Sequence, residues 1–415
     1  MDGSDYQGEQ CPQFGRAMHP YFGLDPGFAN LNHGALGSVP RPVARAYERL
    51  SEQVEANPDR FMWFEYWPKL DEVRASVAKL IGASPDECVF VPNVSHGVNT
   101  VLRNFAWNKG DFIMITNCSF DTISGAAHNI SDMPPHPTVS EFPLHFPESY
   151  SSMLSRFRDH LRSLKVKQAQ SDGDASKKIV VIMDSVPCAP AVLMPWKEMI
   201  QICKEEGAWS LVDAAHSIGQ EIGLDVTKAA PDFWISSCCK WLYAKRPCAV
   251  LYVPKRAGDL GHAHAADYQV RYVCDVVERY IASPVLVALS FRAFLGGEEK
   301  INAYCHQLAL AGGRRMAEIL GTSMMYSAED EEGYNLNMAN VELPIPSTIH
   351  LSLELMHTFQ DKLINEHNTY STQFYHNNKW WTRPSAKVFN EIEDFERLGR
   401  ALVVVCKEIT DKFGK

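Results

Sequence analysis

Two residues suited to covalent chemistry lie where apolar runs of the sequence end. The segment SLVDAAHSIGQ places Asp213 at the end of one such run, with His216 shortly after it. The segment DFWISSCCKWLYAK places Lys240 after another, among cysteine, tryptophan and leucine. A lysine with apolar neighbours is desolvated, which lowers its pKa and favours Schiff-base formation with a carbonyl. A buried Asp213 needs a cationic partner because an isolated buried charge is costly, and a pyridinium nitrogen would supply one.

Simpler interpretations of these residues remain open from the sequence alone. Lys240 could begin an exposed loop, and His216 could be an ordinary histidine in a polar turn. The combination of the lysine with an aspartate upstream favours a cofactor site, because both residues would then serve one prosthetic group.

The elements that must position these residues follow from the hydrophobic pattern. Apolar runs alternate with amphipathic stretches, which predicts an α/β fold with a mostly parallel sheet between helices. Ligands of such sheets bind at the carboxyl ends of the strands, where Asp213 and Lys240 are expected. Helices are expected at 97–107 and 196–206, and the polar run 165–178 is expected to be a loop. The expected strands are 88–91, 112–116, 179–184, 209–213, 233–236 and 249–253.

The pattern changes after about residue 290 to that of a smaller α+β domain. A long helix is expected at 290–320, a strand at 340–343 and a final helix after Asp394. We therefore divide the chain into an N-terminal arm at 1–30, a large cofactor-binding domain at 31–289 and a small C-terminal domain at 290–415.

Composition excludes several classes of protein. The chain has 415 residues, 46% of them hydrophobic, so it can bury a large core and is not disordered. Its formal charge of -10 offers no basic surface for a nucleic acid. Neither a signal peptide nor a membrane span is recognisable, which predicts a soluble, cytoplasmic protein. The 11 cysteines form no CxxC pair, and His262 and His264 alone do not make a metal site, so we expect reduced thiols and no metal.

Several segments together resemble the class V branch of the PLP-dependent aminotransferase superfamily. They are NLNHGALGSVP, VPNVSHGVNTVLRN, VDAAH, SCCKWL, RPCAVLYV, LGGEEKINAYCHQLALAGGRRMAEILGT and RPSAKVFNEIEDFERLG, and they cover about residues 20 to 405. The resemblance is closest to the branch of isopenicillin N epimerase-like proteins, the carbon-sulfur lyase of ergothioneine biosynthesis and the loline-type cyclase. It implies PLP-dependent transferase fold type I with a seven-stranded type of sheet, pyridoxal 5'-phosphate (PLP) as cofactor, and a dimer that builds its active site across the interface.

The resemblance also implies a role for each matching residue. Lys240 would hold PLP as a Schiff base, Asp213 would keep the pyridine nitrogen protonated, and His216 would hydrogen-bond the ring hydroxyl. Arg383, in WWTRPSA, would grip the α-carboxylate of an amino-acid substrate, a task that suits a forked guanidinium. The other implied contacts are Ser95, His96, Gly97 and Ser237 with the phosphate, and Asn32 and His33 with the substrate.

Some of these residues have structural alternatives. Residues 95–97 follow an expected strand and open a helix, so their N–H groups could hold a phosphate or simply belong to a helix cap. Residues 32–34, Asn-His-Gly, are also an ordinary turn sequence, and a lone Arg383 could form a surface salt bridge.

The sequence departs from the family pattern at several cofactor contacts. Ser124 occupies the position where close relatives carry a tyrosine or histidine that stacks on the cofactor, and a serine cannot stack. Cys239 replaces the histidine before the lysine, and the Gly-Thr pair that reaches the neighbouring subunit's phosphate is not recognisable in 261–280. Pro384 and Phe389 replace an apolar residue and a tyrosine near the arginine.

Our leading functional hypothesis is carbon-sulfur lyase activity on a cysteine conjugate or cysteine sulfoxide, with pyruvate and ammonia as co-products. An epimerase or cyclase would use the same cofactor and differ in pocket shape. A desulfurase is disfavoured because the segment 321–347 contains no cysteine to receive sulfur. A different hypothesis is a catalytically degenerate subunit that completes the site of an active paralogue in a heterodimer instead of forming a homodimer.

Overall fold

The central element of the fold is a seven-stranded sheet, seen in the computed structural model, which describes residues 10–170, 177–255, 283–326 and 333–414. β8 is antiparallel to both of its neighbours, and the other pairs of adjacent strands are parallel. The strands are, in spatial order, β2 (Cys88–Val91), β8 (Ala249–Tyr252), β7 (Phe233–Ser237), β6 (Trp209–Asp213), β5 (Ile179–Asp184), β3 (Phe112–Thr116) and β4 (Thr138–Phe142). The predicted mostly parallel α/β fold is therefore confirmed.

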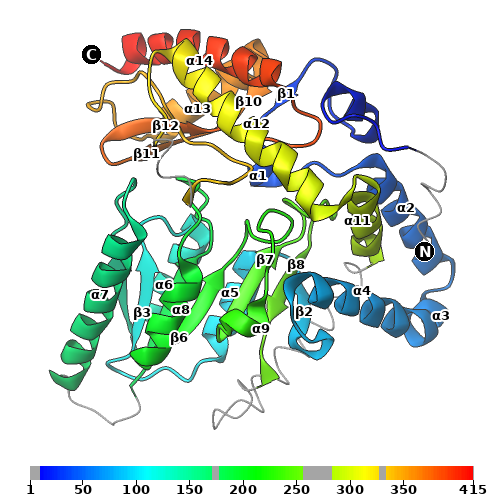
Figure 1. Ribbon diagram of the computed structural model, residues 1–415. Coiled ribbons are helices and arrows are strands. Elements are labelled where there is room, and N and C mark those ends of the chain that lie inside the picture. The colour runs from blue at the N-terminus through cyan, green and yellow to red at the C-terminus, as the bar shows by residue number, and fades with distance from the viewer. Residues whose placement is uncertain (1–9, 171–176, 256–282, 327–332, 415) are drawn as a thin grey trace.

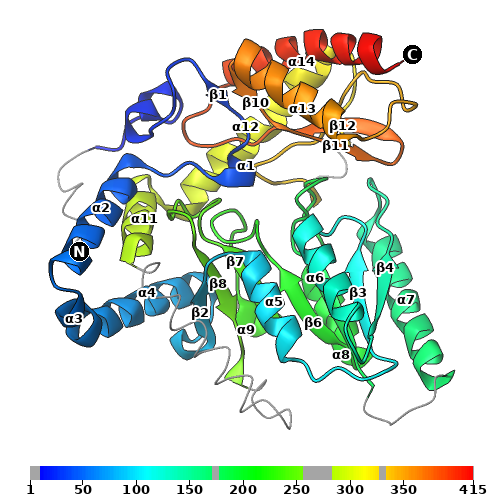
Figure 2. The same cartoon turned by 180° about the vertical axis from the view of Figure 1, so that it is seen from behind.

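Helices cover both faces of this sheet, because its inner strands are apolar on both sides (Figures 1 and 2). Alternate residues of β5 show the division: Val181 and Met183 join one core cluster, whereas Val180 and Ile182 join another. The first face packs against α4 (Tyr66–Ile81), α7 (Tyr150–Gln170) and α8 (Trp196–Glu205), and the second against α5 (Val94–Asn104) and α6 (Asp121–Ser131). The short helix α9 (Val226–Ala229) precedes β7.

The C-terminal part of the chain forms a second layer beyond the sheet (Figure 1). Its three-stranded sheet has the order β11 (Thr372–His376), β12 (Lys379–Arg383) and β9 (Val341–Glu342), with antiparallel pairing. The helices of this region are α11 (Ser283–Phe294), α12 (Gly297–Leu320), α13 (Leu353–Asp361) with a π-helical turn at Lys362–Glu366, and α14 (Ile392–Phe413).

The N-terminal segment packs on this C-terminal layer. β1 (Ala29–Asn30) pairs in parallel with β10 (Thr369–Tyr370), and Met18 and Phe22 join the core cluster that contains α12 and α14. The segment also includes a 3-10 helix (Arg16–Tyr21), α1 (His33–Leu36), α2 (Arg41–Ala56), α3 (Pro58–Arg60) and a π-helical turn (Phe61–Glu65), and a 3-10 turn (Pro85–Glu87) precedes β2. The domain boundaries at 30 and 290 remain our proposal.

Some expected boundaries were wrong. The helix predicted at 97–107 is α5, which begins at Val94 because Asn93 caps it through its side chain. The helix predicted at 290–320 is two helices, α11 and α12, separated at Gly296, whose φ of 104° lies in the left-handed region. The loop predicted at 165–178 is helical as far as Gln170, because Leu161 and Leu164 anchor that end of α7 in the core. Residues 171–176 lie outside the described part of the chain.

Candidate active site

Lys240 and His216 meet at the carboxyl ends of β7 and β6. The two side chains are in hydrogen-bond contact, with 3.1 Å between Lys240 Nζ and His216 Nε2. Burial lowers the pKa of Lys240, and it lowers the pKa of His216 well below its ordinary value, with the charge of Lys240 adding to the effect. A lowered pKa increases the fraction of uncharged amine, which is the form of lysine that attacks carbonyl groups. Lys240 therefore lies beside His216, as predicted, in surroundings that favour its uncharged amine.

Two carboxylates lie side by side at the same edge of the sheet. Asp184 ends β5 and Asp213 ends β6, and the two residues are paired in register. Burial raises the pKa of both, and Asp213 raises that of Asp184 further by like-charge repulsion. The Ala215 N–H donates to Asp213 Oδ1 over 3.0 Å, which favours the charged form of Asp213. The two carboxylates therefore favour a cationic group beside them. The sequence analysis did not identify Asp184 as a residue of this site.

Arg383 reaches the strand ends from β12 of the C-terminal layer. It is fully buried, and its Nη1 donates to the Cys188 carbonyl oxygen and lies 3.1 Å from Cys188 Sγ. Its Nη2 donates to Thr372 Oγ1 over 3.3 Å. Its Nε has no hydrogen-bond partner among the described residues. A buried guanidinium with an unused N–H is suited to bind an incoming carboxylate.

Cys188 is a second residue of this site that sequence reasoning missed. Burial alone would raise the pKa of its thiol, but Arg383 and Lys240 together lower it below the ordinary value. The signal that could have found it is the segment DSVPCAP, where a cysteine follows a strand-end aspartate in the same way that His216 follows Asp213.

Asn32 lies near Arg383, whereas His33 has a different task. Thr372 Oγ1–H donates to Asn32 Oδ1 over 2.7 Å, so Asn32 is linked to Arg383 through one side chain. His33 is fully buried and uses both ring nitrogens within the protein, with Nδ1 accepting from the Ser38 N–H and Nε2 contacting the Lys240 carbonyl oxygen. We therefore propose that His33 positions the backbone of Lys240 and does not contact the substrate.

The expected phosphate contacts lie at the start of α5. The His96 N–H donates to Asn93 Oδ1 and the Gly97 N–H donates to the Asn93 carbonyl oxygen, so both amides are used inside the helix. Gly97 lies close to β7, since a Cβ there would be 3.1 Å from the Ile235 side chain. Of the three predicted residues, Ser95 retains a backbone N–H for which the described residues supply no partner.

The side chains beside Ser95 come from α6. Ser95 Oγ and Thr122 Oγ1 are 2.6 Å apart, which joins the first turns of α5 and α6. Ser124 lies half-buried in the next turn of α6. At the end of β7, Ser237 Oγ contacts Cys239 Sγ over 3.2 Å.

The site thus has two groups of residues. The helix side consists of Ser95, His96, Thr122 and Ser124, and the lysine side consists of Asp213, His216, Lys240 and Trp241.

Trp241, the residue after Lys240, is hydrogen-bonded to His216 and to two basic side chains. Its indole Nε1–H donates to His216 Nδ1 over 3.2 Å. Its carbonyl oxygen accepts from Arg292 Nη1 over 2.7 Å and from Lys387 Nζ over 3.1 Å. Burial, assisted by Arg292, lowers the pKa of Lys387 to about 7. Two basic side chains thus fix the backbone directly after Lys240.

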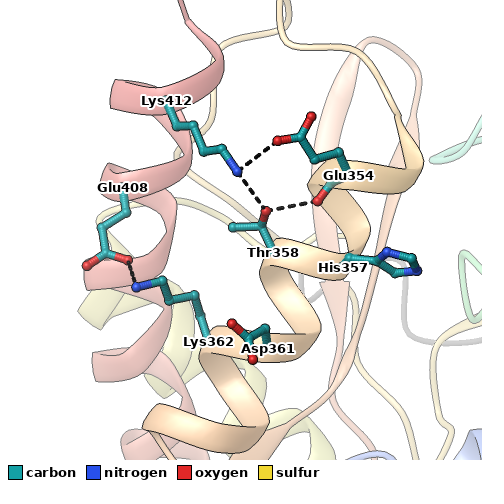
Figure 3. A pocket seen from close by; sticks show the side chains of 7 residues that line it. All are labelled: Glu354, His357, Thr358, Asp361, Lys362, Glu408 and Lys412. Atoms are coloured by element: carbon teal, nitrogen blue, oxygen red, sulfur yellow. Dashed lines mark hydrogen bonds and ion pairs between the residues drawn. The ribbon is translucent and has the colours of Figure 1, made fainter.

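Other parts of the molecule offer less for chemistry. A surface depression between α13 and α14 is lined by acids and lysines that already pair, such as Lys412 with Glu354 and Lys362 with Glu408 (Figure 3). The described residues contain no cluster of three or more metal-binding side chains, and His262 and His264 lie outside them. Among the described helices, none combines the length and apolar character that crossing a membrane requires.

Curated relatives match almost the whole chain. An L-cysteine desulfhydrase-like protein of Epichloe uncinata is 28% identical, over 96% of this chain and 97% of its own length. The hercynylcysteine sulfoxide lyase of Schizosaccharomyces pombe is 29% identical, over 95% of this chain and 98% of its own length. The isopenicillin N epimerase of Streptomyces clavuligerus is 23% identical over 57% of this chain and 56% of its own length.

Solved structures of low sequence identity share the fold. The cystine C-S lyase C-DES, solved with its product cysteine persulfide, superposes with a TM-score of 0.70 at 16% identity, over 91% of this chain and 98% of that one. A cysteine desulfurase from Thermococcus onnurineus NA1 has a TM-score of 0.66 at 16% identity, over 96% of this chain and 100% of that one. The aminotransferase class-V family matches residues 30–134 and 158–264, which include the helix side, Asp213 and Lys240. The chain therefore belongs to the class-V aminotransferase family.

Proposed function

We propose that this protein is a PLP-dependent carbon-sulfur lyase that acts on a cysteine conjugate or a cysteine sulfoxide. Several relatives are named for such reactions, among them the hercynylcysteine sulfoxide lyase of S. pombe and an L-cysteine desulfhydrase of Arabidopsis thaliana. The observation that carries the proposal is the contact of Lys240 with the buried His216, where the charges of Asp213 and Arg383 also act on Lys240.

The residues present fit PLP at its reactive end. Lys240 would carry the cofactor through its Nζ, and Asp213 would pair with the protonated ring nitrogen. The raised pKa values of Asp184 and Asp213 support this, because two buried carboxylates without enough cationic charge favour a cation at their edge. His216 would donate to the ring oxygen.

The fit is weaker at the phosphate end. Ser95 would contribute its free N–H at the start of an 11-residue helix, where the helix dipole favours an anion. Ser237 would contribute a hydroxyl, and His96 has a buried Nε2 without a partner among the described residues. Gly97 would serve the site by letting α5 approach the sheet closely.

The protein's own groups supply substrate binding and proton transfer. PLP supplies the electron sink that makes the α-carbon of a bound amino acid acidic. Arg383 would bind the α-carboxylate through its unused Nε–H, with Asn32 nearby through Thr372. The Lys240 amine would take the α-proton, which allows the bond between the β-carbon and sulfur to break. The sulfur fragment leaves, and water converts the remaining three-carbon unit to pyruvate and ammonia.

The test is pyruvate formation by the purified, PLP-loaded chain with cysteine-conjugate and cysteine-sulfoxide substrates. We expect pyruvate and the sulfur fragment in equal amounts from the wild type. The Lys240→Ala variant, loaded in parallel, is expected to form none above background. Equal pyruvate from both chains, or none from either with any sulfur substrate, would contradict the lyase assignment; racemisation or ring formation without pyruvate would point to an epimerase or cyclase.

We further propose a homodimer. An exposed aromatic patch supports it: Trp63 and Phe64 are 75% and 77% exposed in the single chain, and Trp67 is 41% exposed. Large apolar side chains gathered on a surface mark interaction sites. Light scattering of the wild type is expected to give twice the chain mass, and Trp63→Lys together with Phe64→Lys is expected to give the monomer. A monomeric wild type, or a heterodimer obtained only with a second class V chain, would contradict this proposal.

A further inference from the structure

The hydrogen bond between Trp241 and His216 fixes which nitrogen of the imidazole carries the proton. An indole N–H can only donate, so His216 Nδ1 must accept from Trp241 Nε1 across their 3.2 Å contact. His216 is fully enclosed, and burial holds its pKa well below the ordinary value, so the ring is neutral and carries one proton. That proton must lie on Nε2.

The position of this proton sets the direction of the contact with Lys240. His216 Nε2 lies 3.1 Å from Lys240 Nζ. An Nε2–H donates, whereas an ammonium group has donors and no acceptor. The contact is therefore favourable only when Lys240 is an uncharged amine that accepts through its lone pair. The other tautomer would accept from the ammonium form and stabilise it.

Trp241 is held rigidly enough to enforce this direction. Its side chain is fully buried, and a Cβ added at Gly34 would lie 3.0 Å from the indole ring. Its carbonyl oxygen is fixed by Arg292 and Lys387, and Arg292 also donates to the Gly219 carbonyl oxygen, which ties down the turn after His216. The tryptophan is thus anchored at its ring and at its backbone.

We propose that Trp241 is a positioning residue that fixes the tautomer of His216, so that the imidazole donates from Nε2 to Lys240 and later to the cofactor. The proposal rests on the function above only for its second recipient, the ring oxygen of PLP. The other charged or titratable groups that face Lys240 are Asp184, Cys188, Asp213, Cys239 and Arg383. None of them replaces the Trp241 donor, because none is bonded to His216 Nδ1.

The direct test is the tautomer of His216 in the full-length wild-type chain prepared without cofactor. Long-range nitrogen-proton NMR of ¹⁵N-histidine-labelled protein distinguishes the two tautomers, and the His216→Gln variant identifies the signal. We expect an unprotonated Nδ1 and a protonated Nε2. A protonated Nδ1, or rapid exchange between both forms, would overturn the proposal. This measurement needs neither PLP nor lyase activity, so its outcome is independent of the proposed function.

A second test asks whether the tryptophan controls Lys240. In Trp241→Phe the donor is lost and the ring remains, so His216 can turn its Nε2 into an acceptor for the ammonium form. We expect the pH midpoint of Lys240 acetylation, followed by peptide mass spectrometry, to rise by about one unit, the size of one charge-assisted hydrogen bond. An unchanged midpoint in folded Trp241→Phe would overturn the proposal.

The matched control is Trp234→Phe. Trp234 is also fully buried and lies on β7, but its Nε1 has no hydrogen-bond partner among the described residues. The same loss of volume there is expected to leave the Lys240 midpoint unchanged. If both variants shift the midpoint equally, a general loosening of the core explains the effect and the proposal fails. If Trp241→Phe does not fold, the wild-type tautomer alone decides.

Discussion

Around the half-buried Lys240, the residues Asp213, His216 and Trp241 are buried and joined by hydrogen bonds from several segments. On the helix side, Ser95, His96 and Ser124 are half-buried, Thr122 is exposed, and few side-chain hydrogen bonds join them. On the lysine side, His216 is hydrogen-bonded to Trp241 and to Lys240, and the Trp241 carbonyl oxygen accepts from two basic side chains, Arg292 and Lys387. On the helix side the contact between Ser95 and Thr122 links two helix starts, and His96 keeps an unbonded ring nitrogen within the described structure. Under the proposed function, the protein would preorganise its reactive groups more strongly than the groups that retain the cofactor.

This difference predicts two kinds of variant. Changes on the lysine side should alter the rate of the chemical step while PLP stays bound. Changes on the helix side should alter the affinity for PLP with little effect on the rate of the loaded enzyme.

The largest effect after loss of the lysine is expected for Asp213→Asn. The amide keeps the shape of the carboxylate but removes the charge that favours a protonated ring nitrogen, so kcat should fall by roughly 100- to 1000-fold. The PLP content should remain near that of the wild type. Asp225→Asn is the control, because Asp225 caps α9 and asparagine caps equally well. A similar kcat in Asp213→Asn and wild type would contradict the claim that the lysine side controls the rate of the chemical step.

Arg383→Lys should act on substrate binding. Lysine keeps the positive charge but lacks the forked guanidinium. In Arg383, Nη1 and Nη2 of that fork contact Cys188 and Thr372, and Nε remains available for a carboxylate. We expect KM for the amino-acid substrate to rise by roughly 10- to 100-fold, with a smaller change in kcat. Arg400→Lys, in an exposed ion pair of α14, should leave KM unchanged. An unaltered KM in Arg383→Lys would remove Arg383 from the substrate site.

Lys387 should make stability depend on pH. Its pKa in the folded chain is lowered to about 7 from 10.5, so between these values the unfolded chain binds more protons. The free energy of unfolding should therefore rise with pH in this range, by at most about 1.4 kcal/mol per pH unit from this group. In Lys387→Met the rise should be shallower. Urea unfolding at pH 7 and pH 9 measures both slopes, and equal slopes would contradict the assignment.

The smallest effect is expected for Ser124→Tyr. An aromatic ring at this position of α6 would restore a stacking surface for the cofactor, which should tighten PLP binding by about 2- to 10-fold and leave kcat of the loaded enzyme nearly unchanged. His128→Tyr adds the same ring at an exposed position of α6 and should not change the affinity. Equal PLP dissociation constants for Ser124→Tyr and wild type would show that the helix side is not limited by stacking.

The sequence predicted six of the seven strands of the sheet, because those six are continuous apolar runs. It missed β4 (Thr138–Phe142), an edge strand whose residues TVSEF are mostly polar and, apart from Phe142, not buried.

The sequence also predicted that Asp213, His216 and Lys240 lie where strands end: Asp213 is the last residue of β6, and Lys240 follows β7. Their roles toward a cofactor stay predictions. It missed Asp184, Cys188 and the link from Thr372 to Asn32 because these depend on which distant strands meet. It did not show that both ring nitrogens of His33 have partners within the chain, because the same Asn-His-Gly sequence can face a ligand or a backbone. The revised positioning role of His33 is a proposal.

The predictions of two helix boundaries were wrong because of local features of the chain. Asn93 caps α5 through its side chain, so the helix begins before the glycine that the pattern suggested as its start. Gly296 interrupts what reads as one amphipathic stretch, because its left-handed backbone conformation ends α11.

The most direct test of the account is the visible absorbance spectrum of the purified chain with added PLP, before and after borohydride, beside Lys240→Ala. The account predicts a band in the wild type that borohydride abolishes and that the variant lacks, because we propose that Lys240 bonds the cofactor. The absence of any band in the wild type, or the same band in both proteins, would contradict it and would favour a degenerate subunit that assists an active paralogue.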